Sequence, residues 1–173
     1  DKNFLQTLHN HVSRDFFLLG ETLHGDYNQW MNENMLDSVT NYECYKGLYS
    51  SFNSANFYEI LYSLNRQFGK DPWCLYTGKH LFNFVDNHDV ERIASKLTDL
   101  EKLPLIYGML FSLPGIPCIY YGSEWGTRAD KSQGDPALRP CFEQPEWNEL
   151  TDTIAAMAKA HRESRALCYG DFR

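Results

Sequence analysis

Apolar runs that read as β-strands alternate with helical stretches along this chain, and that alternation constrains its fold more than any other feature. The strand candidates are residues 16–20, 36–42, 81–85 and 118–121. The first is continuously apolar, which is typical of a strand buried on both faces. Strands alternating with helices predict a parallel sheet with right-handed crossovers, and therefore an α/β fold.

Between the strand candidates, apolar residues recur at helical spacing. Helices are predicted over residues 2–13, about 45–68, 101–112 and 148–166. The last strand candidate follows the breaker Pro114-Gly115-Ile116-Pro117. At 173 residues the chain has about the length of one domain. Four strands suit either half of a barrel or a small doubly wound sheet.

Polar clusters stand directly after three of the strand candidates. They are Gly20-Glu21, Asp86-Asn87-His88-Asp89 and Gly122-Ser123-Glu124. One such cluster is explained as well by the start of a solvated loop. Three in phase favour a site, because carboxylates at the carboxyl ends of several parallel strands are the layout of a (β/α)8 barrel active site.

Composition excludes some classes of partner. The net charge of −7 argues against nucleic acid, whose phosphates require clustered Lys and Arg. No apolar run approaches the roughly 18 residues of a membrane span, so no membrane partner is predicted. The 5 cysteines lack C-x-x-C pairs and metal-ligand spacing, which favours reduced thiols in the cytoplasm and no metal site. Because residue 1 is Asp and not Met, a processed and secreted protein is the alternative.

Aromatic residues make up 15% of the chain. Most are expected in the core, but a ring with a flat apolar face and a polar edge also stacks on sugars. Tyr27, Trp30 and Trp125 follow strand ends and are candidates for this second role.

Two of the polar clusters suit chemistry on sugars. Glu21 ends an apolar strand, where a low dielectric favours the protonated form that a general acid needs. His88 and Asp89 leave a buried strand together, an arrangement suited to binding sugar hydroxyls through charge-assisted hydrogen bonds. The plainer alternatives are an exposed loop Glu, a structural His and a helix-capping Asp.

Several segments, in order along the chain, resemble the α-amylase superfamily (glycoside hydrolase family 13). Phe84-Val85-Asp86-Asn87-His88-Asp89 is similar to the strand-7 motif of that family. The other similar segments are residues 17–21 for strand 5, 36–42 for strand 6, 115–124 for strand 8 and 135–140 for the loop beyond. The resemblance implies that residues 1–173 are the C-terminal half of an amylase-type catalytic barrel, with strands 5 to 8 and their helices.

The resemblance also implies site residues. Glu21 would be the acid/base, Asp89 would hold the sugar 2- and 3-hydroxyls and stabilise the transition state, and His88 would contact the same sugar. Glu21-x-x-His24, with Asp37-Ser38-Val39 downstream, is closest to the neopullulanase, cyclodextrinase and maltogenic amylase group, although Leu23 replaces the Trp that many relatives carry.

Two arginines near these motifs are further candidates. Arg139 would line an acceptor subsite or merely support its loop. Arg92 would reach a carboxylate or lie on the surface of the following helix.

The nucleophile of a retaining glycosidase is expected outside this chain. Such a mechanism needs two carboxylates about 5 to 5.5 Å apart. The family supplies the nucleophile from an Arg-x-Asp motif on strand 4, but Arg128-Ala129-Asp130 lies beyond the strand-8 motif and reads as a loop. The chain therefore reads as a fragment that is inactive alone. It needs no cofactor of its own, and calcium is possible in the complete enzyme.

The leading hypothesis is an enzyme that hydrolyses or transglycosylates α-glucosidic bonds in starch-derived oligosaccharides. A non-catalytic carbohydrate-binding or scaffolding relative is the alternative, and a half barrel that dimerises is a third. Because a half barrel leaves strand edges unpaired, self-association is expected. If the barrel interpretation is right, Glu21, His88 and Asp89 must converge at the carboxyl ends of the strands.

Overall fold

The structure is a computed structural model that describes residues 1–172. The strands are β1 (Leu19–Gly20), β2 (Ser38–Val39), β3 (Phe82–Asn83) and β4 (Ile116–Pro117). The longer helices are α1 (Lys2–His11), α2 (Tyr42–Ser54), α3 (Tyr58–Phe68), α5 (Leu103–Ser112) and α7 (Glu149–Glu163). The short helices are α4 (Ile93–Lys96), α6 (Asp135–Leu138) and α8 (Arg165–Tyr169).

The strand pairings are parallel. β1 pairs with β2, and β3 pairs with β4. A parallel bridge between Thr40 and Phe82 joins the two pairs, so the strands lie side by side in chain order. Helices α2 and α3 connect β2 to β3, and α4 and α5 connect β3 to β4. The predicted α/β fold with parallel strands is confirmed.

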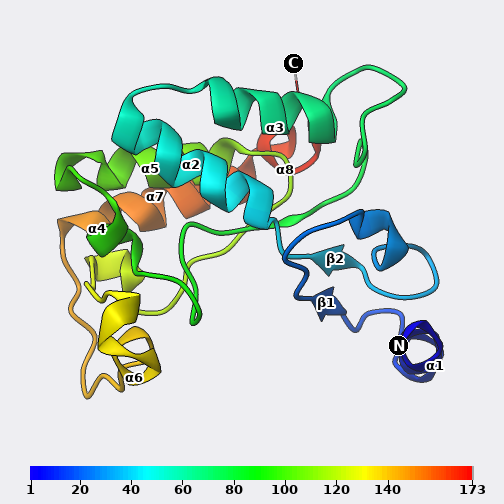
Figure 1. Cartoon of the computed structure of the whole chain (residues 1–173), viewed down its shortest axis with the longest axis horizontal. Coiled ribbons are helices and arrows are strands. Elements are labelled where there is room, and N and C mark those ends of the chain that lie inside the picture. The colour runs from blue at the N-terminus through cyan, green and yellow to red at the C-terminus, as the bar shows by residue number, and fades with distance from the viewer. Residues whose placement is uncertain (173) are drawn as a thin grey trace.

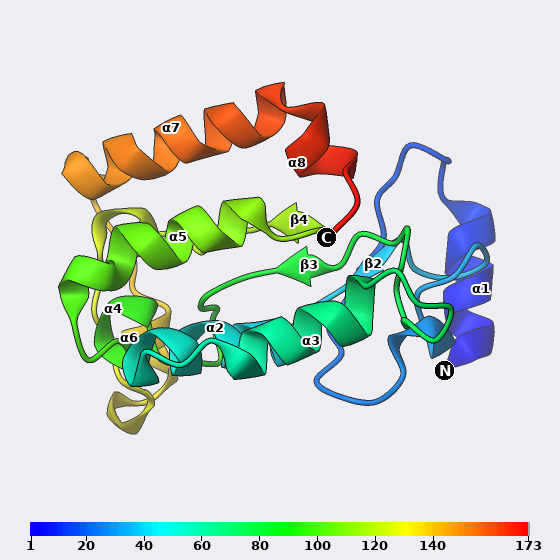
Figure 2. The same ribbon diagram turned by 90° about the horizontal axis from the view of Figure 1, so that it is seen from above.

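The helices cover one side of the strands. Figures 1 and 2 show α2, α3, α5 and α7 gathered together, with α1 at the far end of the molecule. The core lies under this helix layer, where Val39, Leu48, Leu81, Ile106 and Leu110 are fully buried. Helix α5 is apolar on nearly all sides because it packs against both α2 and α7. Within residues 1–172 no helix is both long and apolar enough to cross a membrane.

The first strand candidate is not buried on both faces, so that prediction is wrong for this chain. Phe16, Phe17 and Leu19 are 58%, 51% and 41% exposed, and Leu18 alone of the apolar run is buried. Among the described residues β1 has β2 as its only neighbouring strand, and no strand pairs with its other edge. An apolar run at a bare edge of the sheet is thus left in contact with solvent.

The helical stretch predicted over residues 45–68 is two helices. Ala55 ends α2 in the left-handed region, with a φ of 53°. The small polar residues around it offer alternative hydrogen bonds that compete with the helix. The side chain of Lys102 donates to the Phe52 carbonyl at 2.8 Å and so satisfies one of the last carbonyls of α2.

The last strand lies earlier than predicted, at Ile116–Pro117 within the segment interpreted as a breaker. Gly115 makes this possible with a φ of 120°, since a Cβ there would lie 2.4 Å from the Leu81 carbonyl oxygen. The backbone therefore pairs with β3 two residues earlier than predicted, where the Ile116 N–H donates to the Leu81 carbonyl at 2.8 Å. Pairing still reaches the predicted run, because the Cys118 N–H donates to the Asn83 carbonyl at 2.8 Å.

A buried polar network links the loops after β3 and β4. Asp86 is 1% exposed, and its Oδ2 accepts hydrogen bonds from the Ile93 N–H at 2.8 Å and the Ser123 hydroxyl at 2.7 Å. Arg92 is fully buried and donates to the Ser123 hydroxyl and to the carbonyls of Tyr121 and Leu138. Its guanidinium also lies 4.2 Å from the centre of the Tyr120 ring.

Burial raises the pKa of Asp86 to about 6, although the hydrogen bonds from Ile93 and Ser123 and the charge of Arg92 act in the opposite direction. Arg92 therefore neither lies on the surface nor donates to a carboxylate. Instead it binds two carbonyl groups and the serine that holds Asp86.

We expect Ala55→Gly to raise the free energy of unfolding by about 1 kcal/mol, because glycine adopts a positive φ without the Cβ clash. Ala158→Gly, at an exposed position inside α7, is the matched control and should lower it by about 1 kcal/mol. Urea denaturation measures both changes. If the two substitutions changed the free energy of unfolding in the same direction, the left-handed conformation at Ala55 would be contradicted.

We expect Asp86→Asn to remove a pH dependence of stability. The folded-state pKa of Asp86 is raised, so the folded protein retains a proton that the unfolded chain loses, and stability falls as pH rises from 3.8 through about 6. The free energy of unfolding of wild type, relative to Asp86→Asn, should fall by roughly 2 kcal/mol between about pH 4 and about pH 7. Urea melts of both proteins across this range measure it, and a difference independent of pH would be the contrary result.

Candidate active site

Side chains from two strands meet at the carboxyl edge of the sheet. Glu21 follows β1, and His88 and Asp89 follow β3. Their ligand atoms all lie within 4.8 Å of one another. Parallel strands make this possible, since their carboxyl ends share one edge. The structure thus brings together the three residues expected to converge.

Arg139 holds Asp89 from the loop beyond β4. Its guanidinium donates to Asp89 Oδ1 at 2.7 Å and to the His88 carbonyl at 3.2 Å. His88 Nε2 lies 3.4 Å from Asp89 Oδ2, and the three side chains are each close to half exposed. Lys131 adds a hydrogen bond to the Asp89 carbonyl at 3.0 Å. One carboxylate is therefore oriented by a guanidinium while its surface stays open to a ligand.

Glu21 is contacted by a residue to which the sequence assigned no role. The hydroxyl of Tyr42 donates to Glu21 Oε1 at 2.8 Å. Asn87, inside the polar cluster after β3, donates through Nδ2 to that same hydroxyl at 2.8 Å. The available signal was the position of Tyr42 at the end of a strand candidate, on the edge that carries Glu21.

A cavity of about 300 Å³ lies beside these groups. Residues at or just beyond every strand line it: Leu19, Glu21, Thr40, Phe82, Phe84, Asp86, Asn87, His88, Cys118 and Tyr120. It combines an apolar floor with a few polar groups, which is the usual make-up of a small-molecule site.

His24 lies outside the cluster formed by Glu21, His88 and Asp89. It is exposed and shares with Glu21 the lining of a neighbouring hollow of about 580 Å³, beside Leu23 and Trp30. A contact between His24 and a ligand held by Glu21 therefore remains a prediction.

Tyr27 belongs to the core and is not a surface platform. It is 3% exposed and stacks on Tyr76, with ring centres 5.3 Å apart. Trp125 is half-buried and meets Phe142 edge-on at 5.2 Å. Burial removes the first ring from any contact with a ligand.

The cluster of Glu21, His88 and Asp89 has the residue types of a metal site, but its surroundings suit a neutral ligand better. A cation there would meet the Arg139 guanidinium at Asp89 Oδ1 and the Tyr42 donor at Glu21 Oε1. Both carboxylates already hold positive or donor groups. Sugar hydroxyls, which both donate and accept, fit the remaining lone pairs.

A larger cavity, of about 650 Å³, lies at the other end of the strands, where Phe17, Asp37, His80 and Gly115 precede them. Several of the polar side chains that line it already contact main-chain carbonyls. His161 Nδ1 contacts the Phe111 carbonyl, and the side chains of Cys168 and Lys79 donate to main-chain carbonyls.

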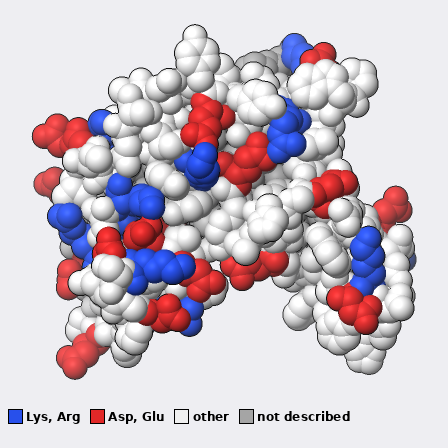
Figure 3. Space-filling view, in the orientation of Figure 1, with Lys and Arg blue, Asp and Glu red and all other residues white. Residues whose placement is uncertain are grey.

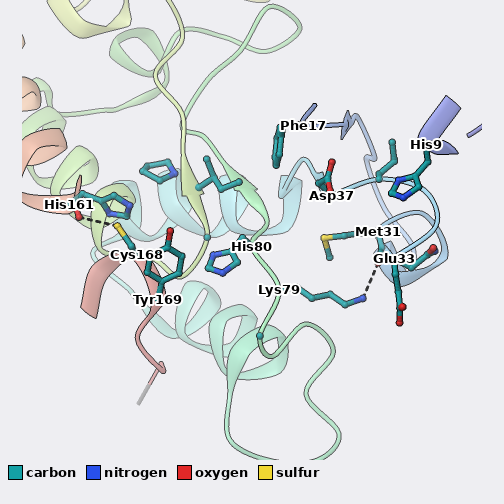
Figure 4. A pocket seen from close by; sticks show the side chains of 16 residues that line it. His9, Phe17, Met31, Glu33, Asp37, Lys79, His80, His161, Cys168 and Tyr169 are labelled. Atoms are coloured by element: carbon teal, nitrogen blue, oxygen red, sulfur yellow. Dashed lines mark hydrogen bonds between the residues drawn. The ribbon is translucent and has the colours of Figure 1, made fainter. Parts of the chain in front are cut away.

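Figure 4 shows the polar groups of this cavity spread apart and not converging on one point. Its lining therefore lacks the convergence seen around Glu21.

On the face in Figure 3, basic and acidic side chains are interspersed, without a separate basic patch.

Comparison with known proteins agrees with the motifs and the fold. The family model for the alpha amylase catalytic domain matches residues 1–166. A maltogenic alpha-amylase of Bacillus acidopullulyticus is 30% identical over 140 residues, which are 79% of this chain and 22% of that protein. A cyclomaltodextrinase of a Bacillus species is 28% identical over 160 residues, 87% of this chain and 28% of that protein.

The fold matches solved structures of the same kind. The maltogenic amylase from S. marinus has a TM-score of 0.77 at 26% identity, covering 99% of this chain and 25% of that one. The cyclic alpha-maltosyl-(1→6)-maltose hydrolase from Arthrobacter globiformis, in complex with that sugar, has a TM-score of 0.75 at 26% identity, with 96% and 38% covered. The chain thus spans well under half the length of these relatives. With its catalytic-domain match over nearly its full length, this chain belongs to the α-amylase family of glycoside hydrolases.

Proposed function

We propose that residues 1–173 form the second half of a (β/α)8 catalytic barrel, with β1 to β4 as its strands 5 to 8. The parallel order of the strands and the carboxylates at one edge support this assignment. The exposed Phe16 and Phe17 beside β1 support it as well, since a neighbouring strand would cover them. The chain matches only 22% and 28% of the length of two relatives, which fits the same interpretation.

The complete gene product that contains this chain is proposed to hydrolyse or transglycosylate α-glucosidic bonds in starch-derived oligosaccharides. The convergence of Glu21, His88 and Asp89 within 4.8 Å carries this proposal. A relative bound to cyclic α-maltosyl-(1→6)-maltose makes an α-glucan the natural substrate class. A scaffold or a simple sugar-binding domain has no need of a carboxyl group held at this point by a phenol, so the enzyme is favoured over that alternative.

In the proposed mechanism Glu21 protonates the glycosidic oxygen and later removes a proton from the attacking water. Asp89, held by Arg139, binds the 2- and 3-hydroxyls and stabilises the oxocarbenium-like transition state, and His88 contacts the same sugar. Arg139 and His24 are also proposed to contact the substrate. These steps use no metal ion or cofactor from this chain, and calcium is proposed only for the complete enzyme.

The nucleophile is proposed to come from outside this chain. Asp130 of the Arg-x-Asp triplet is exposed, and its carboxylate caps a turn by accepting from the Ser132 N–H at 2.8 Å. Asp86 is buried and already bonded to Ile93 and Ser123. Neither is free to attack a sugar beside Glu21.

The cysteines support a reducing compartment. All 5 cysteines fall within the described residues and are unpaired. We therefore propose that the enzyme is cytoplasmic, with a secreted enzyme as the alternative.

In the complete gene product, Glu21→Gln should lower kcat on maltohexaose by about 1,000-fold, because the amide cannot deliver a proton to the leaving oxygen. Maltohexaose affinity, measured by calorimetry, should change little because the shape is kept. Glu33→Gln, an exposed carboxylate at the opposite end of the strands, is the control and should keep full activity. Near-normal turnover in Glu21→Gln would remove Glu21 from the acid/base role.

The isolated chain should release no reducing ends from maltohexaose, because acid assistance without a nucleophile gives no covalent intermediate. It should also elute as a dimer or larger species in size exclusion with light scattering, because β1 has a bare edge beside exposed apolar side chains. Phe17→Lys should weaken that association, whereas Tyr62→Lys, at a position 68% exposed on α3, should not. A monodisperse monomer with steady turnover would show that the chain is complete by itself.

A further inference from the structure

Tyr42 stands where a strand and a helix meet. It is the first residue of α2, directly after the Asn41 cap whose side chain accepts from the Cys44 N–H. Its ring meets the buried Phe84 edge-on at 4.9 Å and Tyr45 at 6.1 Å. Helix, cap and ring contacts therefore fix the position of its hydroxyl beside Glu21.

The direction of each hydrogen bond around Tyr42 follows from chemistry alone. The Asp89 N–H can only donate, and it lies 2.9 Å from Asn87 Oδ1, so that atom is the amide oxygen. The amide nitrogen of Asn87 then faces Tyr42 and donates to its oxygen at 2.8 Å. The single phenol proton is left for Glu21 Oε1, which is also 2.8 Å away.

The phenol keeps its proton across the range of an activity assay. Burial, opposed by the hydrogen bond from Asn87 and reinforced by Glu21, raises the pKa of Tyr42 to about 12. Tyr42 is therefore a permanent donor to Glu21, and not an acid or base that exchanges protons with it.

We propose that Tyr42, oriented by Asn87, is a positioning residue that occupies Glu21 Oε1 and leaves Oε2 as the oxygen that carries the catalytic proton. This inference rests on the proposed acid/base role of Glu21. The Asn87 side chain connects the segments that carry the two functional carboxylates. Its Oδ1 accepts from the backbone N–H of Asp89, and its Nδ2 donates to the phenol of Tyr42. A hydrogen bond donated to a carboxylate also favours its charged form.

Tyr42→Phe in the complete gene product is the direct test. It removes one oxygen and keeps the ring that packs on Phe84. We expect kcat on maltohexaose to fall about tenfold with KM within about twofold, since a positioned proton donor acts mainly on the chemical step. We expect the alkaline limb of the kcat/KM profile to move to higher pH, because the charged carboxylate loses a donor.

Two further variants separate positioning from packing. Tyr45→Phe removes a hydroxyl from the ring that stacks on Phe84 at 5.3 Å but lies outside the hydrogen-bond chain, and it should leave the profile unchanged. Asn87→Asp keeps the shape and the acceptor for the Asp89 N–H but replaces the donor to Tyr42 with an acceptor. It should turn the phenol proton away from Glu21 and move the alkaline limb in the same direction as Tyr42→Phe.

A measurement independent of activity completes the test. The Glu21 carboxyl carbon, identified in ¹³C-glutamate-labelled protein by its loss in Glu21→Gln, should change its NMR chemical shift in Tyr42→Phe and keep it in Tyr45→Phe, because only the first variant removes the hydrogen bond to Oε1. An unchanged chemical shift and an unmoved alkaline limb would overturn the inference. A changed chemical shift in a protein that cleaves no α-glucan would uphold the hydrogen-bond chain and refute the proposed function instead.

Discussion

Asn41 joins the two halves of the strand layer, and the position of every site residue depends on that junction. Its N–H donates to the Phe82 carbonyl at 2.9 Å, beside the Thr40–Phe82 bridge that aligns β2 with β3. Its buried side chain exchanges hydrogen bonds with Gln67 and donates to Asn83 at 2.9 Å. The same side chain caps α2. Because each strand has only two residues, this buried amide cluster supplies alignment that a longer ladder would otherwise give.

A second polar network supports the edge of the sheet that carries the candidate active site. Asp86 and Arg92 are buried near one another and are connected through the Ser123 hydroxyl, so hydrogen bonds join the loops after β3 and β4. Arg92 also binds the Leu138 carbonyl, next to the Arg139 that holds Asp89. Burying a guanidinium is costly, and here it is offset by carbonyl and aromatic contacts that place the site's own arginine.

The parts of the fold that follow from local patterns were predictable. The alternation of strands and helices, the parallel sheet and the carboxylates at one edge all come from periodicity and from the order of polar clusters. The errors lie where a distant segment decides. The backbone of β4 pairs early because Gly115 can touch the Leu81 carbonyl, and Ala55 breaks a helix whose end is satisfied by Lys102. Phe16 and Phe17 are exposed because no described segment covers them.

The sequence by itself determined the fold class and the family and predicted that Glu21, His88 and Asp89 would lie together, because short motifs and their order along the chain carry this information. The tertiary structure alone decided which groups surround those side chains. Tyr42 reaches Glu21 from 21 residues away and Arg139 reaches Asp89 from 50 residues away. No local periodicity encodes such contacts, since they exist only once parallel strands bring their carboxyl ends to one edge and the following loops fold back over it.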